Sequence, residues 1–153
     1  MKSRIISSLL LILIFIQFTG CAKDENITET NENSIITNVI LSNEIEKIDV
    51  YIAKDFDKST DKPLISIIDK EIINEISQIL KESDSLPGIL DVSSPKYLIE
   101  IYNSKFKETE VVYLWVEKEG YKGMCMNMNN TNKGYEISAS NNEKIKQIIM
   151  DEK

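Results

Sequence analysis

Three aspartates in one polar stretch have the spacing of the oxygen ligands in a calcium-binding loop. Asp55, Asp57 and Asp61 alternate with other side chains, as the ligands of such a loop do. Thr60 stands where the loop needs a glycine for its sharp turn, and Ser66 stands where a bidentate glutamate would complete the coordination. The stretch is therefore either a weak calcium site or a solvated loop, and the two departures favour the loop.

Three methionines offer a second set of possible metal ligands. On a strand Met124, Met126 and Met128 would share one face and Cys125 would take the other, because successive side chains alternate. Thioether sulfur suits Cu(I). Residues on one face are, however, roughly 6.6 Å apart along a strand, which is wide for one ion, and methionine often fills irregular gaps in a core. A core strand is preferred over a copper site.

An aromatic strand provides a candidate binding face. Val111, Tyr113 and Trp115 lie on one face of the predicted strand, and the residues between them make the other face equally apolar. If the helices cover only one face, the aromatic face is open to bind a sugar or a peptide. If a hairpin or loop covers it, the strand is buried on both sides. The sequence leaves both alternatives open.

The first residues have the order of an export signal. Lys2 and Arg4 precede an apolar segment, residues 5–18, which is too short to span a bilayer. Two small or polar residues follow, and then Cys21. The sequence therefore predicts a signal peptide at residues 1–20.

The segment Phe18-Thr19-Gly20-Cys21 resembles the lipobox of bacterial lipoproteins. The resemblance implies that the Cys21 thiol is joined to diacylglycerol and that cleavage leaves Cys21 as the first residue, with a further acyl chain such as palmitate. Two or three acyl chains, at about 0.8 kcal/mol per buried methylene, hold a protein stably at a membrane. The expected location is the outer, extracytoplasmic face of the cell membrane, with this lipid as the only covalent group and no other cofactor.

The net charge of the mature chain limits the classes of partner that it is expected to bind. Removing residues 1–20 leaves 16 basic against 25 acidic residues, a net charge of −9, which disfavours nucleic acid. The expected partners are the membrane, through the lipid anchor, and a protein or a glycan. Residues 21–33 are almost wholly polar and predict a flexible tether, so residues 34–153 are expected to form a single domain.

The chain lacks residues that many enzymes use. It has no histidine, and Arg4, its only arginine, leaves with the signal peptide. A histidine base, a histidine metal ligand and an arginine phosphate clamp are therefore excluded. Ser59 and Lys62 match the S-x-x-K start of serine–lysine enzymes, but Pro63 follows directly and no K-T-G partner exists. The sequence predicts a protein that is not an enzyme.

Hydrophobic periodicity predicts the elements of the domain. Alternating or continuous apolar runs predict strands at residues 34–41, 44–54, 64–68, 96–102, 108–118, 121–128 and 134–138. Apolar residues at three-to-four spacing predict a helix from the N-cap Asp69 to Lys81, and Ser140 with Glu143 predicts a capping box for a final helix. The predicted fold class is α+β: a mostly antiparallel sheet of about five to seven strands with two amphipathic helices packed on one face.

Several short motifs carry a family resemblance. They are Leu86-Pro87-Gly88-Ile89-Leu90-Asp91-Val92, Pro95-Lys96-Tyr97, Tyr113-Leu114-Trp115 and Tyr135-Glu136-Ile137-Ser138. In this order, ahead of a short final helix, they resemble the YhfM-like domain of small bacterial lipoproteins over most of residues 45–150. The resemblance implies a fold and a location but no activity.

The function expected from the sequence is that of a membrane-anchored extracytoplasmic lipoprotein that binds a ligand or partner without catalysis. The first alternative is a lipoprotein that binds copper or calcium through the methionines or the aspartates above. A hydrolase of the cell envelope comes third, because the chain has no histidine.

Overall fold

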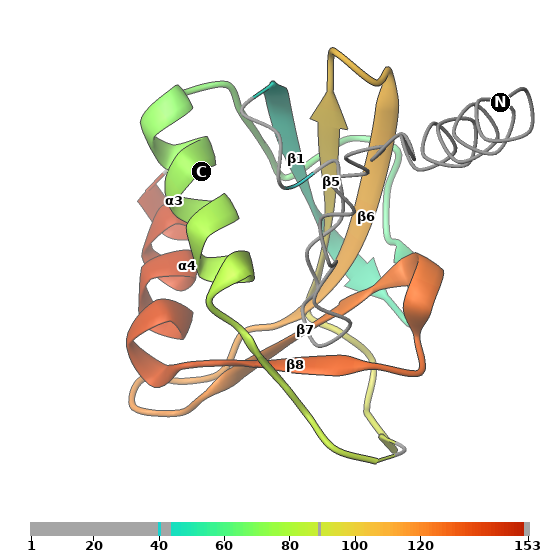
Figure 1. Ribbon diagram of the computed structural model, residues 1–153, viewed down its shortest axis with the longest axis vertical. Helices are drawn as coiled ribbons and strands as arrows, with labels where there is room; N and C mark the ends of the chain where they lie inside the picture. The colour runs from blue at the N-terminus through green and yellow to red at the C-terminus, as the bar shows by residue number, and fades with distance from the viewer. Residues whose placement is uncertain (1–39, 41–43, 89, 152–153) are drawn as a thin grey trace, which may run out of the picture.

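The structure is a computed structural model that describes residue 40, residues 44–88 and residues 90–151. In this part of the chain an eight-stranded antiparallel sheet carries two helices on one face (Figure 1). This architecture confirms the predicted α+β class. The predicted signal peptide and tether lie outside the described residues.

Five longer strands form the body of the sheet, in the order β1-β5-β6-β7-β8. Their bounds are β1 Ile45–Lys54, β5 Tyr97–Asn103, β6 Glu108–Trp115, β7 Gly123–Asn127 and β8 Gly134–Ile137. Three short strands extend them: β2 (Asp57–Lys58) and β3 (Ile65–Ile67) pair with β1, and β4 (Asp84–Ser85) pairs with β8. The sheet bends strongly, so that β7 and β8 run across the direction of β1, β5 and β6 (Figure 1).

The predicted strands between residues 44 and 138 correspond to β1, β3, β5, β6, β7 and β8, with ends that differ by a few residues. The two-residue strands β2 and β4 were not predicted, because such short segments show no periodicity. The strand predicted at residues 34–41 lies outside the described residues except for Ile40, which is helical. A short 3-10 helix, η1 (Met128–Asn130), follows β7.

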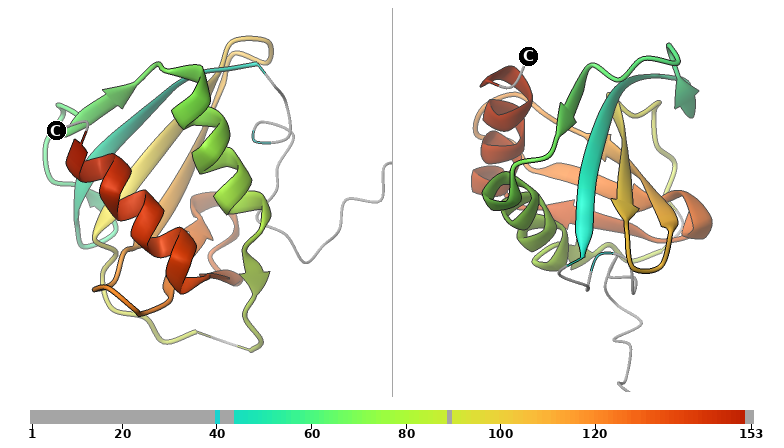
Figure 2. Two further views of the ribbon diagram at one scale, coloured as in Figure 1. Left: turned by 90° about the vertical axis from the view of Figure 1, so that its left-hand side faces the viewer. Right: turned by 90° about the horizontal axis from the view of Figure 1, so that it is seen from above.

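The first described helix, α3 (Lys70–Lys81), follows the sequence prediction closely. The Asp69 carboxylate accepts hydrogen bonds from the backbone N–H groups of Glu71, at 2.8 Å, and Ile72, at 3.2 Å. This N-cap satisfies donors that a helix start otherwise leaves without partners. α3 lies beside the last helix across the same face of the sheet (Figure 2).

The last helix, α4 (Ala139–Asp151), starts one residue before the predicted cap at Ser140. The hydroxyl that accepts from the first turn belongs to Ser138, whose Oγ lies 3.3 Å from the backbone nitrogen of Asn141. Glu143 pairs with Lys146 at 3.3 Å. The predicted capping box was therefore wrong, because Ala139 favours the helix and lets it begin directly after β8.

In the described part of the chain no helix is both long and apolar enough to cross a membrane.

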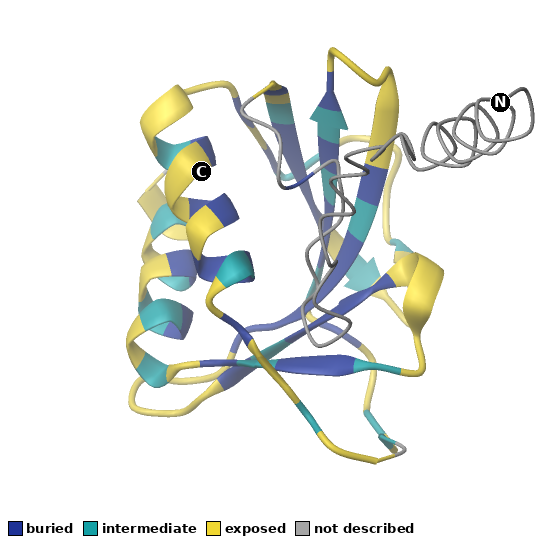
Figure 3. Ribbon diagram, viewed as in Figure 1, coloured by how far each residue is buried: buried dark blue, intermediate teal, exposed yellow. Residues whose placement is uncertain are grey.

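Buried apolar side chains form a cluster on each face of the sheet. The larger cluster lies between the sheet and the helices, where Ile48, Ile101 and Leu114 are fully buried, and the sides of α3 and α4 that face the sheet are buried too (Figure 3). The smaller cluster, on the opposite face, consists of Tyr51, Leu98, Tyr113, Trp115 and Met126. The central strands are therefore apolar on both faces.

A buried asparagine fastens α4 to the end of β6. Asn142 is 1% exposed, and its Oδ1 accepts from the backbone N–H of Glu117 at 2.9 Å while its Nδ2 donates to the Glu117 carbonyl at 3.1 Å. The amide side chain thus pairs both backbone groups of one residue just beyond the sheet. Gly123 makes room for it, since a Cβ at that position would lie 2.6 Å from Asn142 Oδ1.

Replacing Asn142 by Ala leaves both backbone groups of Glu117 without this partner. We expect the free energy of unfolding to fall by about 1–3 kcal/mol, measured by urea denaturation. The matched control is Asn141→Ala, because the Asn141 amide bonds an exposed Glu82 and its loss should cost less than about 0.5 kcal/mol. Equal losses for the two variants would contradict this role of Asn142.

Candidate functional site

The structure places the aromatic residues of the candidate binding face inside the protein. Tyr113 is 4% exposed and Trp115 is 8% exposed, while Val111 is half-buried. The predicted alternation is correct, because these residues belong to the smaller cluster and Val112, Leu114 and Val116 belong to the larger one. The aromatic face is therefore not open. The structure has the alternative arrangement, in which the strand is covered on both sides.

Two loops provide the cover. The Trp115 indole Nε1 donates to the Ser93 carbonyl at 2.8 Å, and the Tyr113 hydroxyl donates to the Phe56 carbonyl at 3.1 Å. Leu90 and Val92 pack against the cluster from the same loop as Ser93. Such bonds give the polar atoms of the rings a partner away from water, so the aromatic residues are part of the core. Trp115 and Met124 are among the residues that line a hollow of about 370 Å³ beside this loop.

The three methionines do not share one environment. Met124 and Met126 pack with the smaller cluster, and Cys125 lies on the opposite face with no exposure, as the alternation predicts. Met128 is 49% exposed, because the Asn127 side chain accepts from the backbone N–H of Asn129 and turns the chain into η1. The three sulfur atoms are therefore not presented together on one strand face.

The three aspartates lie around the turn after β1. Asp55 adopts a positive φ of 55°, Asp57 lies in β2 and accepts from the backbone N–H of Lys58, and Asp61 is exposed in the loop that follows. Among the described residues, no group of three or more His, Cys, Asp or Glu is arranged to hold a metal ion. Cys21, the predicted lipid attachment residue, lies outside the described residues.

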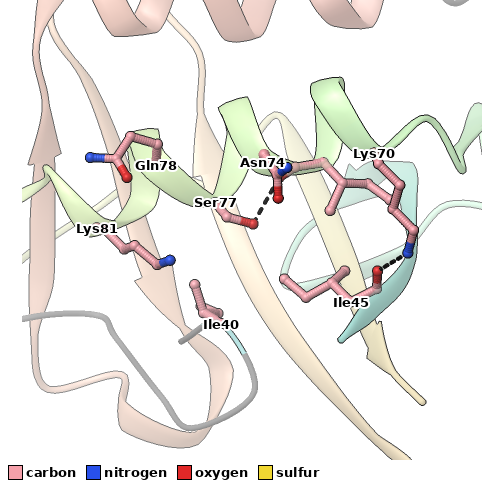
Figure 4. Close-up of a pocket in the computed structure, with 8 residues that line it drawn as sticks. Ile40, Ile45, Lys70, Asn74, Ser77, Gln78 and Lys81 are labelled. Atoms are coloured by element: carbon pink, nitrogen blue, oxygen red, sulfur yellow. Dashed lines mark hydrogen bonds between the residues drawn. The ribbon is translucent and has the colours of Figure 1, made fainter. Parts of the chain in front are cut away.

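A hollow of about 530 Å³ lies along α3 (Figure 4). Its polar residues already have internal partners at two points: Lys70 Nζ donates to the Ile45 carbonyl at 2.5 Å, and Ser77 Oγ donates to the Ile73 carbonyl at 2.7 Å. Ile40 forms one wall, next to residues outside the described part of the chain. Among the described residues that line this hollow, no buried side-chain oxygen or nitrogen lacks a hydrogen-bond partner.

A second hollow, of about 390 Å³, lies on the sheet face opposite the helices, and we call it the charged hollow. Its lining residues are Glu46, Lys47, Asp49, Ile68, Glu100, Tyr102 and Thr109. It lies on the same face as the smaller cluster, because side chains alternate along β1 and β5 and Tyr51 and Leu98 belong to that cluster. The sheet face is thus apolar where the loops cover it and charged where it is open.

The pairing of β1 with β5 brings two carboxylates face to face. Asp49 is the register partner of Glu100, and Lys47 is the partner of Tyr102. Directly opposed side chains have Cβ atoms about 4.5–5.5 Å apart, and like charges at such positions are destabilising. The sequence therefore places a repulsive pair at the centre of the hollow.

Two lysines offset this repulsion. Lys47 Nζ lies 2.6 Å from Asp49 Oδ2, and Lys58 Nζ lies 2.6 Å from Glu100 Oε1. The hydrogen bond to Asp49 raises the pKa of Lys47, and the hydrogen bond to Glu100 raises the pKa of Lys58. Burial, followed by its hydrogen bond to Glu100, raises the pKa of the Tyr51 hydroxyl. Both ammonium groups are therefore charged at neutral pH.

One carboxylate oxygen of Asp49, a residue that lines the hollow, has no partner. The Asp49 side chain is 8% exposed, and its Oδ1 is buried and accepts no hydrogen bond, although Ser66 is its register partner on β3. A buried carboxylate oxygen without a donor costs stability, so such an atom requires an explanation. The arrangement can accept a hydrogen bond or a positive charge from a molecule that enters the hollow.

The sequence did not single out these residues. The alternation of Lys47, Asp49 and Tyr51 along one predicted strand, and of Leu98, Glu100 and Tyr102 along another, shows that each strand has a mixed polar and apolar face. What no pattern supplies is that the two strands are neighbours in this register. The sequence therefore shows the polar face of each strand, but it does not show that these two faces lie side by side.

The fold and the site together define a two-layer α+β protein with a charged hollow on the uncovered sheet face. Residues 41–153 match the family described as YhfM protein, and the chain therefore belongs to the YhfM family. No curated protein matches the chain. Among solved structures it resembles a thioesterase-like protein from Clostridium sporogenes, with 20% sequence identity and a TM-score of 0.50, over 68% of this chain and 93% of that chain. At this identity the likeness shows the fold alone.

Cys125 has the environment of an inert core thiol. Burial raises its pKa from 9.0 to about 12, and its contact with Ser83 Oγ at 3.7 Å acts in the opposite direction. Only the thiolate is a nucleophile, so a thiol of this kind does not react at neutral pH. The unfolded chain loses the thiol proton near the ordinary pKa of 9.0. The contribution of the buried thiol to the free energy of unfolding is therefore fully present below about pH 9 and is lost as the pH rises towards the folded-state pKa of about 12.

We expect Cys125 to resist thiol reagents while the protein is folded. In the variant Cys21→Ala it is the one remaining cysteine. The reaction with an aromatic disulfide that releases a coloured thiolate, followed at mildly alkaline pH, therefore reports on Cys125 alone. The rate should be negligible in buffer and rapid in guanidinium chloride. Rapid reaction of the folded protein would contradict the burial of this thiol.

Proposed function

We propose that the protein is a lipid-anchored, extracytoplasmic binding module whose ligand site is the charged hollow. The observation that carries the proposal is the unpaired, buried oxygen of Asp49 in a hollow on the sheet face that the helices leave open. β1 and β5 hold the residues in place, because they pair over seven registered positions. Sites on paired strands are more rigid than sites on loops, which lowers the cost of ordering them on binding.

Several observations favour binding over catalysis. In the unbound protein each of the two carboxylates is ion-paired with a lysine ammonium. The Cys125 thiol is enclosed in the core, and the chain has no histidine. The solved neighbour is described as thioesterase-like, but its likeness extends to the fold alone. Binding of a ligand, without a covalent step, is the function that these residues support best.

The anchor part of the proposal rests on the sequence. A signal of residues 1–20 ending before Cys21 would leave that cysteine to carry the lipid on the outer face of the membrane. The twelve residues between Cys21 and Ser34, as a flexible tether, would span about 20 Å, so the domain would stand close to the bilayer. The charged hollow would then meet molecules of the envelope space.

The anchor is tested by replacing Cys21 with Ala. The parent protein should take up radioactive palmitate and sediment with membranes, whereas the variant should take up none and remain in the soluble fraction or the medium. A variant at a nearby tether position, Thr28→Ala, should behave like the parent. Palmitate labelling that survives Cys21→Ala would show that lipid attachment at this residue is wrong.

The binding part is tested with a photo-crosslinking amino acid in the native host. Placed at Thr109, which lies exposed at the rim of the charged hollow, benzoylphenylalanine should give an adduct that depends on ultraviolet light and disappears with Asp49→Asn. Placed at Gln147 on the exposed side of α4, it should give no adduct that depends on Asp49. An adduct at Thr109 that is insensitive to Asp49→Asn, or no adduct, would contradict the proposed site.

A further inference from the structure

The charged hollow has the features of a pocket for one particular side chain. We propose that it receives the guanidinium group of an arginine presented by a peptide or protein ligand. This assignment rests on the proposed binding function and names the chemistry of its ligand. It follows from the carboxylates, the apolar wall and the ring that surround the unpaired oxygen of Asp49.

The acceptors in the hollow match a forked donor. Asp49 and Glu100 stand directly opposite each other on adjacent strands, so one planar group inserted between them can donate to both. A guanidinium has five N–H groups in a fixed fork and carries its charge at every accessible pH, which suits paired carboxylates. Glu46 adds a third carboxylate at the edge. An ammonium group is a compact point charge and satisfies these acceptors less completely.

Lys47 occupies the position that the ligand would take. Its ammonium contacts Asp49 Oδ2 and leaves Oδ1 without a partner. The Lys47 side chain is 43% exposed, so it can turn out into water at little cost when a better donor arrives. The incoming guanidinium then bonds both oxygens of Asp49, and the buried oxygen gains the donor that the unbound protein does not supply.

The rest of the hollow suits the length of an arginine side chain. Ile68 lies at its edge and is 71% exposed, although it is a large apolar residue. It offers a surface for the three methylene groups of the arginine stem. Tyr102 is half-buried and contributes a ring on which a guanidinium plane can stack.

The ligand comes from another molecule. The sequence contains Arg4 as its only arginine, and that residue lies in the predicted signal peptide. The chain is acidic, with a net charge of −7 over its whole length, so a basic partner is attracted over long range. A metal ion is a poorer fit, because no set of three or more His, Cys, Asp or Glu among the described residues is placed to hold one.

The test is calorimetric titration of the full-length protein in a neutral detergent with the capped tripeptide Gly-Arg-Gly. The matched peptide carries citrulline, which has the shape of arginine without its charge. We expect arginine to bind at least about tenfold more tightly than citrulline, and Asp49→Asn and Glu100→Gln each to weaken it at least about tenfold. Glu75→Gln removes one acidic charge from α3, on the helical face of the protein, and should leave the affinity unchanged.

Equal binding of arginine and citrulline, no binding of either, or binding that neither carboxylate variant changes would overturn the assignment. Lysine in place of arginine with equal affinity would also overturn it. Asp49-dependent binding of diacetylchitobiose instead would replace the peptide by a glycan. If the arginine peptide does not bind but the Thr109 adduct still depends on Asp49, the binding function stands without its arginine ligand; if the adduct is insensitive too, both fall. Thermal melting of each variant shows that it is folded.

Discussion

The antiparallel pairing of β1 with β5 is the constraint on which both the core and the site depend. Seven registered positions join the two strands, and from Lys47 to Ile52, beyond a register shift after Ile45, every second residue of β1 points to the same face. One set, which includes Ile48 and Ile101, fills the core under the helices, and the other set brings Asp49 opposite Glu100. A slip of one residue would exchange the two sets, exposing the core residues and burying the charges. The packing of the core therefore fixes the geometry of the hollow.

The two faces of the sheet are covered by different elements. Helices α3 and α4 cover one face, and loops cover the apolar part of the other through the bonds of Trp115 to Ser93 and of Tyr113 to Phe56. The loops stop short of the end where Lys47, Asp49 and Tyr102 lie, and there the face is charged and hollowed. A sheet that is apolar on both sides needs cover on both, and the uncovered remainder is where a ligand has room.

Much of the fold could be predicted because its signals are local. The three-to-four spacing behind Asp69 gave α3, and alternation gave β1 and the two faces of β6. The cover over Trp115 could not be predicted, because the loop that supplies it has no periodic pattern. The position of Met128 outside the strand could not be predicted either, because it depends on one hydrogen bond, from the backbone N–H of Asn129 to the Asn127 side chain. The site depends on which strands are neighbours, and a sequence without pairing information does not contain that fact.

The central claim is that Asp49 is present for binding and costs the fold stability. The most direct measurement is the free energy of unfolding of Asp49→Asn in urea, beside the parent and Glu75→Gln. The substitution removes a buried charge and its repulsion from Glu100, and it loses one ion pair to a lysine that stays in contact with water. The account predicts that stability stays the same or rises by up to about 1 kcal/mol. A loss of more than about 2 kcal/mol would show that Asp49 is held as part of a structural ion pair, and would contradict the account.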